Sequence, residues 1–179
     1  MPLLKPKNIL PVVCWIFIFI WFSGGSEVSA QNEITSQRKS LQGLQQFYLT
    51  VNLAAGSDLS EKKALDLPKI QEEAVQKLKS ADLPLETGKT PGGQQHAMLI
   101  MHINTMDAGR GIVPFAVNID LYQPVKLTLN RDLEQTASTW NTGNVGVVSY
   151  DNLPTIRESA ITLLEDFIND YKAANRSIE

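Results

Sequence analysis

The chain has two histidines, His96 and His102, which are its first candidates for acid–base or metal chemistry. If residues 96–103 form one strand, the two side chains share a face but lie about 20 Å apart, because a strand advances about 3.3 Å per residue. A single metal ion cannot join them. His102 lies in an apolar run and has the same parity as Asp120 on the expected neighbouring strand, so this pair is the candidate for catalysis.

Paired carboxylates and nucleophiles give weaker signals. Asp166 and Asp170 lie four residues apart with Glu165 beside them, which permits cation binding, but this spacing is more typical of a solvated helix face. No Gly-x-Ser-x-Gly elbow is present, and the only cysteine is Cys14. We therefore expect neither a metal site nor a cofactor. We also expect a non-catalytic protein in preference to an enzyme.

Glycine-rich stretches and large aromatic residues supply candidate binding residues. Gly109-Arg110-Gly111 is an expected turn that does not match a phosphate-binding fingerprint, and Arg110 is its candidate for anion contact. Tyr122 falls on the polar parity of its strand, and Trp140 precedes a glycine-rich stretch. Exposed aromatics often mark contact surfaces, so Tyr122 and Trp140 are candidate binding residues, although Trp140 is also interpreted as a core residue.

The N-terminus has the order of a secretory signal peptide over residues 1–30. Lys5 and Lys7 precede an uncharged apolar run at 9–22, and Val28-Ser29-Ala30 fits a cleavage site. Cleavage there would remove Cys14 and leave a chain without thiols. The alternative is a retained anchor, although the apolar run is shorter than the ~20 residues of a spanning helix. In both cases we expect export, to the periplasm, the envelope or the medium, with membrane contact only through an uncleaved N-terminal segment.

Composition limits the remaining functions. The net charge is −3 and no basic cluster occurs, so the pattern excludes a typical nucleic-acid binder. We expect a disordered lead-in at 31–40, a single domain at 41–175 and a frayed tail at 176–179, since that length suits one domain.

Hydrophobic periodicity predicts the elements of this domain. Period-two alternation predicts strands, and apolar residues at helical spacing predict two helices; the expected order is a strand at 47–53, a helix at 66–81, strands at 97–103, 113–129 and 134–149, and a helix at 153–174.

Three local features refine this order. The strand at 113–129 keeps its phase across Pro124, so a bend with Pro124 on a sheet edge is expected. Gly143 and Gly146 predict a bulge or turn in the next strand. Asn152 is the expected cap of the last helix.

This order of strand, helix, three strands and helix predicts an α+β fold. Each helix must bury its apolar stripe on a sheet, and the simplest arrangement is a two-layer sandwich with both helices on one face of a mostly antiparallel sheet. The connection from Ile103 to Val113 is the expected hairpin loop.

The C-terminal third resembles an ending of uncharacterised bacterial exported proteins, through the pattern Thr139-Trp140, Gly143, Gly146, Ile156-Arg157, Phe167, Tyr171 and Asn175. The order of elements is also similar to small α/β modules of bacterial envelope assembly proteins. The resemblance implies a bacterial envelope setting and transfers no functional residue.

Three functions follow as hypotheses. The first is a non-catalytic envelope module that binds another protein, with the edge of the strand at 113–129 accepting a partner strand. The second is a carrier of a small molecule or lipid in a cavity between helices and sheet. The third is a hydrolase that uses His102 and Asp120, which requires the two side chains to lie within hydrogen-bond reach.

Overall fold

A computed structural model describes residues 36–55, 59, 65–88 and 96–176. The residues from Gln37 onward belong to one compact unit. The expected signal peptide at 1–30 and the loop at 89–95 lie outside the described residues. Within the described ranges, no helix is both long enough and apolar enough to span a membrane.

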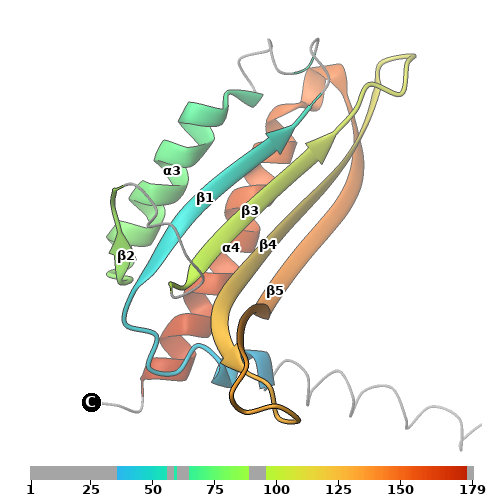
Figure 1. Cartoon of the computed structure of the whole chain (residues 1–179). Helices are drawn as coiled ribbons and strands as arrows, with labels where there is room; N and C mark the ends of the chain where they lie inside the picture. Colours follow the sequence, from blue (N-terminus) through green and yellow to red (C-terminus); the bar gives the residue numbers. More distant parts are fainter. Residues whose placement is uncertain (1–35, 56–58, 60–64, 89–95, 177–179) are drawn as a thin grey trace, which may run out of the picture. The chain divides into compact units, whose positions relative to one another are not determined.

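The unit is built on a five-stranded sheet with the order β2-β1-β3-β4-β5 (Figure 1). The strands are β1 (Phe47–Ala54), β2 (Leu85–Glu86), β3 (Met98–Thr105), β4 (Ile112–Lys126) and β5 (Glu134–Ser149). β1 pairs in parallel with both β2 and β3, whereas β3, β4 and β5 pair antiparallel. The sheet is therefore mixed, not mostly antiparallel as the sequence suggested, because helix α3 (Leu67–Ser80) carries the chain back across the sheet between β1 and β3.

Alternation along the strands separates two faces of the sheet. The odd-numbered residues of β3 and β4 from Leu99 to Leu121 are buried on one face, and Phe47 and Val51 of β1 lie on the same side. The even-numbered residues are half-buried or exposed on the other face. The period-two pattern of the sequence thus describes a sheet with one dry face and one open face.

β4 keeps its phase past Pro124, as expected, but ends at Lys126 instead of 129. The pairing of β4 with β3 ends at Tyr122, so Pro124 lies where β5 is its only neighbour in the sheet. A proline is tolerated at such a position because no partner strand needs its missing N–H. The expected edge position of Pro124 follows from the unequal lengths of β3 and β4.

The bulge in β5 is not at the glycines, which corrects the expectation from sequence. The register shift falls where Leu121 pairs with Trp140 and Tyr122 pairs with Ser138, so Thr139 is the extra residue. The ladder runs unbroken past Gly143 and Gly146. At Gly146 a Cβ atom would lie 2.7 Å from two ring atoms of Phe115, so this glycine makes room for an aromatic side chain of β4.

Helices α3 and α4 (Pro154–Asn175) bury the stripes that the sequence predicts. Ile70, Ala74 and Leu78 are the buried residues of α3. Those of α4 are Ile156, Ala160, Ile161, Leu163, Leu164, Phe167 and Ile168. Asn152 does not cap α4, because a 3-10 turn (Tyr150–Asn152) occupies that segment and Leu153 takes the cap position without a side-chain hydrogen bond.

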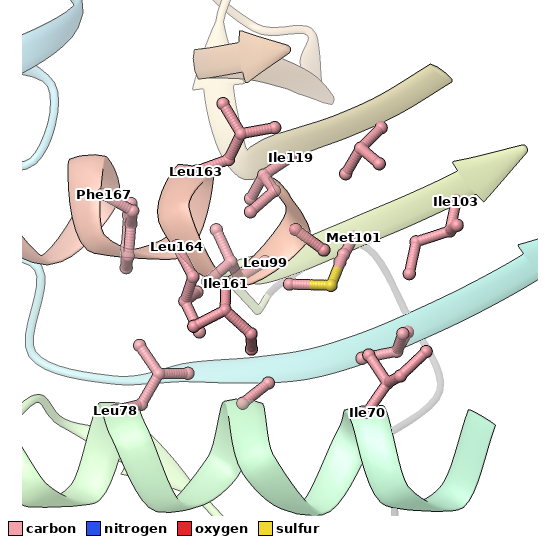
Figure 2. Packing of buried hydrophobic residues seen from close by; sticks show 14 of the residues in the cluster. Ile70, Leu78, Leu99, Met101, Ile103, Ile119, Ile161, Leu163, Leu164 and Phe167 are labelled. Atoms are coloured by element: carbon pink, nitrogen blue, oxygen red, sulfur yellow. The ribbon is translucent and has the colours of Figure 1, made fainter. Parts of the chain in front are cut away.

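Both helices lie against the same face of the sheet and share one core with it (Figures 1 and 2). Figure 2 shows Leu78 of α3, Leu164 of α4 and Met101 of β3 pointing into this layer. At one end of this core, the centroid of the Phe167 ring lies 5.1 Å from that of Trp140 and 5.5 Å from that of Phe47. Buried side chains therefore fill the space between helices and sheet.

The end of α4 orders the segment that precedes β1. Asn175 accepts a hydrogen bond from Gly43 N–H at 2.9 Å and donates to the Leu41 carbonyl at 3.1 Å. Tyr171 donates to the Leu44 carbonyl at 3.0 Å. Residues 37–39 are helical and Leu41 is fully buried. The expected disordered lead-in at 31–40 is therefore wrong for residues 37–40, and residues 31–35 lie outside the described residues.

Candidate functional site

The open face of the sheet is the surface on which polar side chains gather. No described helix covers it, and it carries amide, carboxyl and imidazole side chains at neighbouring positions of four strands. These residues are Asn52 of β1, His102 and Asn104 of β3, Asn118 and Asp120 of β4, and Asn141 of β5. The parity of the strands alone places them together, because residues two apart point to the same face.

Part of this face forms a hollow of about 380 Å³, called here the polar hollow. Its lining comes from three adjacent strands and consists of His102, Asn104, Asn118, Asp120, Tyr122, Asn141, Thr142 and Gly143. Three of the candidates singled out from sequence, His102, Asp120 and Tyr122, therefore meet in one place. Asp120 is the only carboxylate among these lining residues, and none of them is a lysine or an arginine.

His102 and Asp120 share the open face but are diagonal neighbours. His102 stands opposite Asn118, two positions from Asp120, and such diagonal neighbours are typically about 7–8 Å apart. The imidazole Nδ1 of His102 lies 3.5 Å from the amide of Asn52, whereas Asp120 accepts from the Ser138 hydroxyl at 3.1 Å. Between these two described residues the structure records no hydrogen bond, so the geometry shows two separate polar pairs.

Asn118 lies against Gly143 in the floor of the polar hollow. A Cβ atom at Gly143 would overlap the Asn118 Oδ1 atom and would lie 3.2 Å from the Val117 carbonyl oxygen. The glycine therefore provides the space in which the Asn118 amide rests against the neighbouring strand. Asn118 has no protein hydrogen-bond partner within the described residues, so the donor and acceptor of its amide face the solvent.

A second hollow of about 440 Å³ adjoins the polar one and is apolar. Its lining residues are Ala54, Asn104, Thr105, Met106, Pro114, Phe115 and Ala116, and Asn104 lines both hollows. Nearby on β5, Val145 and Val147 stand opposite Ala116 and Pro114 and are 76% and 66% exposed. The open face thus changes from polar to apolar toward the hairpin between β3 and β4.

The sequence suggested that the strand at 113–129 offers an edge, but this prediction is wrong. That strand, β4, lies between β3 and β5 and pairs with both over residues 115–122. The edge strands are β2, of 2 residues, and β5, of 16 residues. β5 is therefore the long strand with a free side (Figure 1).

Backbone hydrogen bonds at the hairpin fix the direction of the β4 peptide groups. The carbonyl of Ile112 accepts from Ala108 N–H at 3.0 Å, and the carbonyl of Pro114 accepts from Met106 N–H at 3.4 Å. Both donors belong to the segment that follows β3. The carbonyls of Ile112 and Pro114 therefore point toward β3 and away from β5.

This direction determines which residues of β5 face outward. Ser149 and Val147 stand opposite Ile112 and Pro114, so these are pairs without mutual hydrogen bonds. In such pairs the N–H and C=O groups point away from the partner strand. The alternation continues to Val145, Gly143 and Asn141, so the odd-numbered residues from Asn141 to Ser149 direct their backbone groups outward. No described residue pairs with this side of β5.

The other candidate residues lie elsewhere. Trp140 is 2% exposed and donates its indole N–H to Asp170 at 3.1 Å, so it packs in the core and is not a surface contact. Arg110 is exposed at the tip of the hairpin with a positive φ of 56°. In the same loop Asp107 accepts from Gly109 N–H at 2.7 Å, so a carboxylate of the protein already occupies this backbone donor.

His96 precedes β3, and so the two histidines do not share a strand. Its ring lies against Tyr48, with centroids 5.8 Å apart, beside a third hollow of about 460 Å³ at the opposite end of β3 from the hairpin. The described residues contain no group of three or more His, Cys, Asp and Glu side chains placed to hold a metal ion.

The helical carboxylates form contacts with the protein. Lys77 of α3 pairs with Glu165, and Arg38 pairs with Asp170. Burial, followed by the charges of Asp170 and then Glu165, raises the pKa of Asp166 above its ordinary value. This cluster joins α4 to its neighbours instead of lining a hollow.

Sequence reasoning missed Asn104, Asn118 and Asn141. Asparagine is depleted in strands because it packs poorly on a pleated surface and favours turns. Asn118 and Asn141 lie within two of the predicted strands, whereas Asn104 directly follows the strand predicted at 97–103. The recurrence of asparagine at these places was the available signal. Its significance depends on strand register, which brings the three amides to one hollow.

No protein-family model and no curated protein matches the chain. Among solved structures, a hypothetical protein from Chlamydia trachomatis has a TM-score of 0.44 and 9% identity, over 72% of this chain and 98% of that one. An uncharacterized protein has a TM-score of 0.33 and 10% identity, over 77% of this chain and 94% of that one.

A minor lipoprotein from Acinetobacter baumannii has a TM-score of 0.32 and 9% identity, over 74% of this chain and 93% of that one. All three TM-scores are below 0.5, so these likenesses assign no function. The chain itself has an α+β fold with a five-stranded mixed sheet.

Proposed function

We propose that the chain is an exported, non-catalytic module that binds an envelope protein by accepting one of its strands along β5. The observation that carries this proposal is the outward-facing backbone of Asn141 to Ser149 on a strand with no described neighbour on that side. Strand addition supplies backbone hydrogen bonds for affinity and side-chain positions for specificity. The secretory order of residues 1–30 supports the envelope as the place of binding.

The two edges of the sheet differ in how they are protected. Natural sheets prevent unwanted pairing with short edge strands, charges, prolines or bulges. β2 is protected by its length of 2 residues. β5 has neither a charged residue nor a proline from Gln135 to Ser149, and its bulge at Thr139 leaves the following residues regular. An edge that is this long and this poorly protected is explained by a partner that pairs with it.

The exposed valines indicate the pattern of the partner strand. A strand added beside β5 places its own open-face side chains next to Asn141, Val145 and Val147. We expect apolar residues beside the two valines and a polar residue beside Asn141, in an alternating segment without proline.

The test uses a photocrosslinking amino acid at Val145 or Val147 in the full chain, exported in a bacterial host. The control position is Glu158, which is exposed on α4. We expect one discrete crosslinked protein from the β5 positions, none from Glu158, and loss of the product when Val145→Pro is added to the Val147 crosslinker variant. Recovery of uncrosslinked monomer from both β5 positions, or equal crosslinking from Glu158, would overturn the proposal.

A further inference from the structure

The polar hollow is lined by residue types that are unfavourable in strands, and the asparagines among them gain no hydrogen bond within the described part of the protein. Asparagine and aspartate are unfavourable in strands, yet Asn104, Asn118, Asp120 and Asn141 all stand on the open face of β3, β4 and β5. Among the described residues, none of the three asparagine side chains has a protein hydrogen-bond partner. Positions where a sequence departs from its local preferences without compensation are expected to be functional.

The size and the lining of the polar hollow also suit a small ligand. Its volume of about 380 Å³ is within the range of small-molecule sites. Gly143 leaves the space that the Asn118 amide occupies, and the Ser138 hydroxyl holds the Asp120 carboxylate at 3.1 Å. Tyr122 adds an aromatic ring and a hydroxyl at one side.

The chemistry of the lining selects among ligands. Amide side chains both donate and accept hydrogen bonds, which matches the hydroxyl groups of a sugar. A phosphate or another anion is disfavoured, because the described lining holds one carboxylate and no lysine or arginine. An extended peptide would need free backbone groups, and those of β3 and β4 are used in the sheet.

From these observations we infer that the polar hollow binds a neutral saccharide. Asn104, Asn118 and Asn141 donate to and accept from the ring hydroxyls, Asp120 accepts from one hydroxyl, and the Tyr122 ring packs against a sugar face. This site lies on the face of the sheet and shares the Asn141 side chain with the strand whose backbone forms the outward edge of β5. The inference does not depend on partner binding at that edge.

The experiment titrates the isotope-labelled full chain with the neutral sugars triacetylchitotriose and maltotriose and follows backbone amide signals by NMR. We expect signals of β3, β4 and β5 around the hollow to shift with at least one trisaccharide at millimolar concentration. Asn118→Ala should weaken this binding about tenfold, the effect of a lost hydrogen-bonding group. Gly143→Ala should weaken it as well, since the methyl group displaces Asn118.

The matched control for Asn118→Ala is Asn144→Ala, which removes an amide from the neighbouring strand β5 on the opposite face of the sheet, where it donates to Ser159 at 3.0 Å. This variant should bind the trisaccharide like the unaltered chain, and thermal unfolding confirms that each variant folds. The inference is overturned if neither sugar shifts the hollow signals, if Asn118→Ala and Asn144→Ala weaken binding equally, or if inorganic phosphate binds in the hollow in place of the sugars.

Discussion

Trp140 on β5 donates its indole N–H to Asp170 on α4 at 3.1 Å, and this bond closes the core at one end. The other carboxylate oxygen of Asp170 accepts from Arg38 Nε at 2.8 Å. One side chain thus joins the edge strand, the last helix and the segment before β1. Because β5 carries the proposed binding edge, Asp170 also helps to position that edge on the helix layer.

Asp170→Ala should lower the free energy of unfolding by about 1–3 kcal/mol, because it leaves the buried indole N–H unpaired. Asp170→Asn keeps an acceptor oxygen and should lose less. Urea denaturation measures both values. Asn169→Ala, at an exposed neighbouring position of the same helix, is the control and should have little effect; an equal loss in this variant would contradict the role of the bond.

Asp166 should make the protein less stable as the pH rises. Its pKa is raised in the folded state, first by burial and then by Asp170 and Glu165. The folded protein therefore holds this proton more tightly than the unfolded chain, and stability falls as the pH rises from the ordinary aspartate pKa through the raised value.

Asp166→Asn removes this effect. The variant should gain about 0.2–0.5 kcal/mol at neutral pH, the usual size of a like-charge repulsion four residues apart on a helix. Unfolding measured across the acidic to neutral range should then depend less on pH. A variant that is less stable than the unaltered chain at neutral pH would contradict the prediction.

Gly146→Val should destabilise the sheet because its side chain overlaps the Phe115 ring. The Cβ position lies 2.7 Å from two atoms of that ring, and overpacking of this kind typically lowers stability by about 1–3 kcal/mol. Phe115→Leu in the same chain should recover part of the loss. Chemical denaturation of the two single variants and the double variant gives their coupling; additive losses would mean that the ring and the new side chain do not meet.

The outward direction of the β5 backbone predicts different effects for prolines three positions apart. Val145→Pro removes an N–H that points away from β4, so it should reduce stability only slightly. Val148→Pro removes an N–H that bonds to β4 and leaves a carbonyl of β4 without its partner, which should cost about 1–3 kcal/mol.

Thermal unfolding compares the two proline variants, and amide hydrogen exchange tests the same assignment without mutation. The amides of Val145 and Val147 should exchange fast, whereas those of Asn144 and Val148 should be protected. The reverse order would place the free backbone groups on the even-numbered residues and contradict the proposed strand addition.

The sequence pattern predicted most elements but not their neighbours in the sheet. Alternation from Val113 to Leu121 and the stripe of α4 identified a strand and a helix correctly, since burial of one face leaves a local period. The parallel pairing of β1 with β3 was predictable in principle, because an intervening helix such as α3 requires a crossover. The bulge at Thr139 had no local signal, since glycine at 143 and 146 was the more obvious irregularity.

The candidate site was likewise predictable from the sequence only in part. Sequence alone selected His102 and Asp120 as a candidate pair and Tyr122 as an exposed aromatic residue, and the structure places all three around one hollow. It did not identify Asn118 or Asn141, and it assigned the free edge to the strand at 113–129 instead of β5.

The sequence by itself determined the α+β composition and the apolar face of each strand and helix. It also predicts secretion from the pattern of residues 1–30. These properties depend on the spacing of residues along the chain. Tertiary structure decided the strand order, the register that brings Asn118 onto Gly143, and the outward direction of the backbone at Val145. These depend on pairings between residues far apart in sequence, where the backbone hydrogen bonds and the packing of the core select one arrangement among many that share the same local pattern.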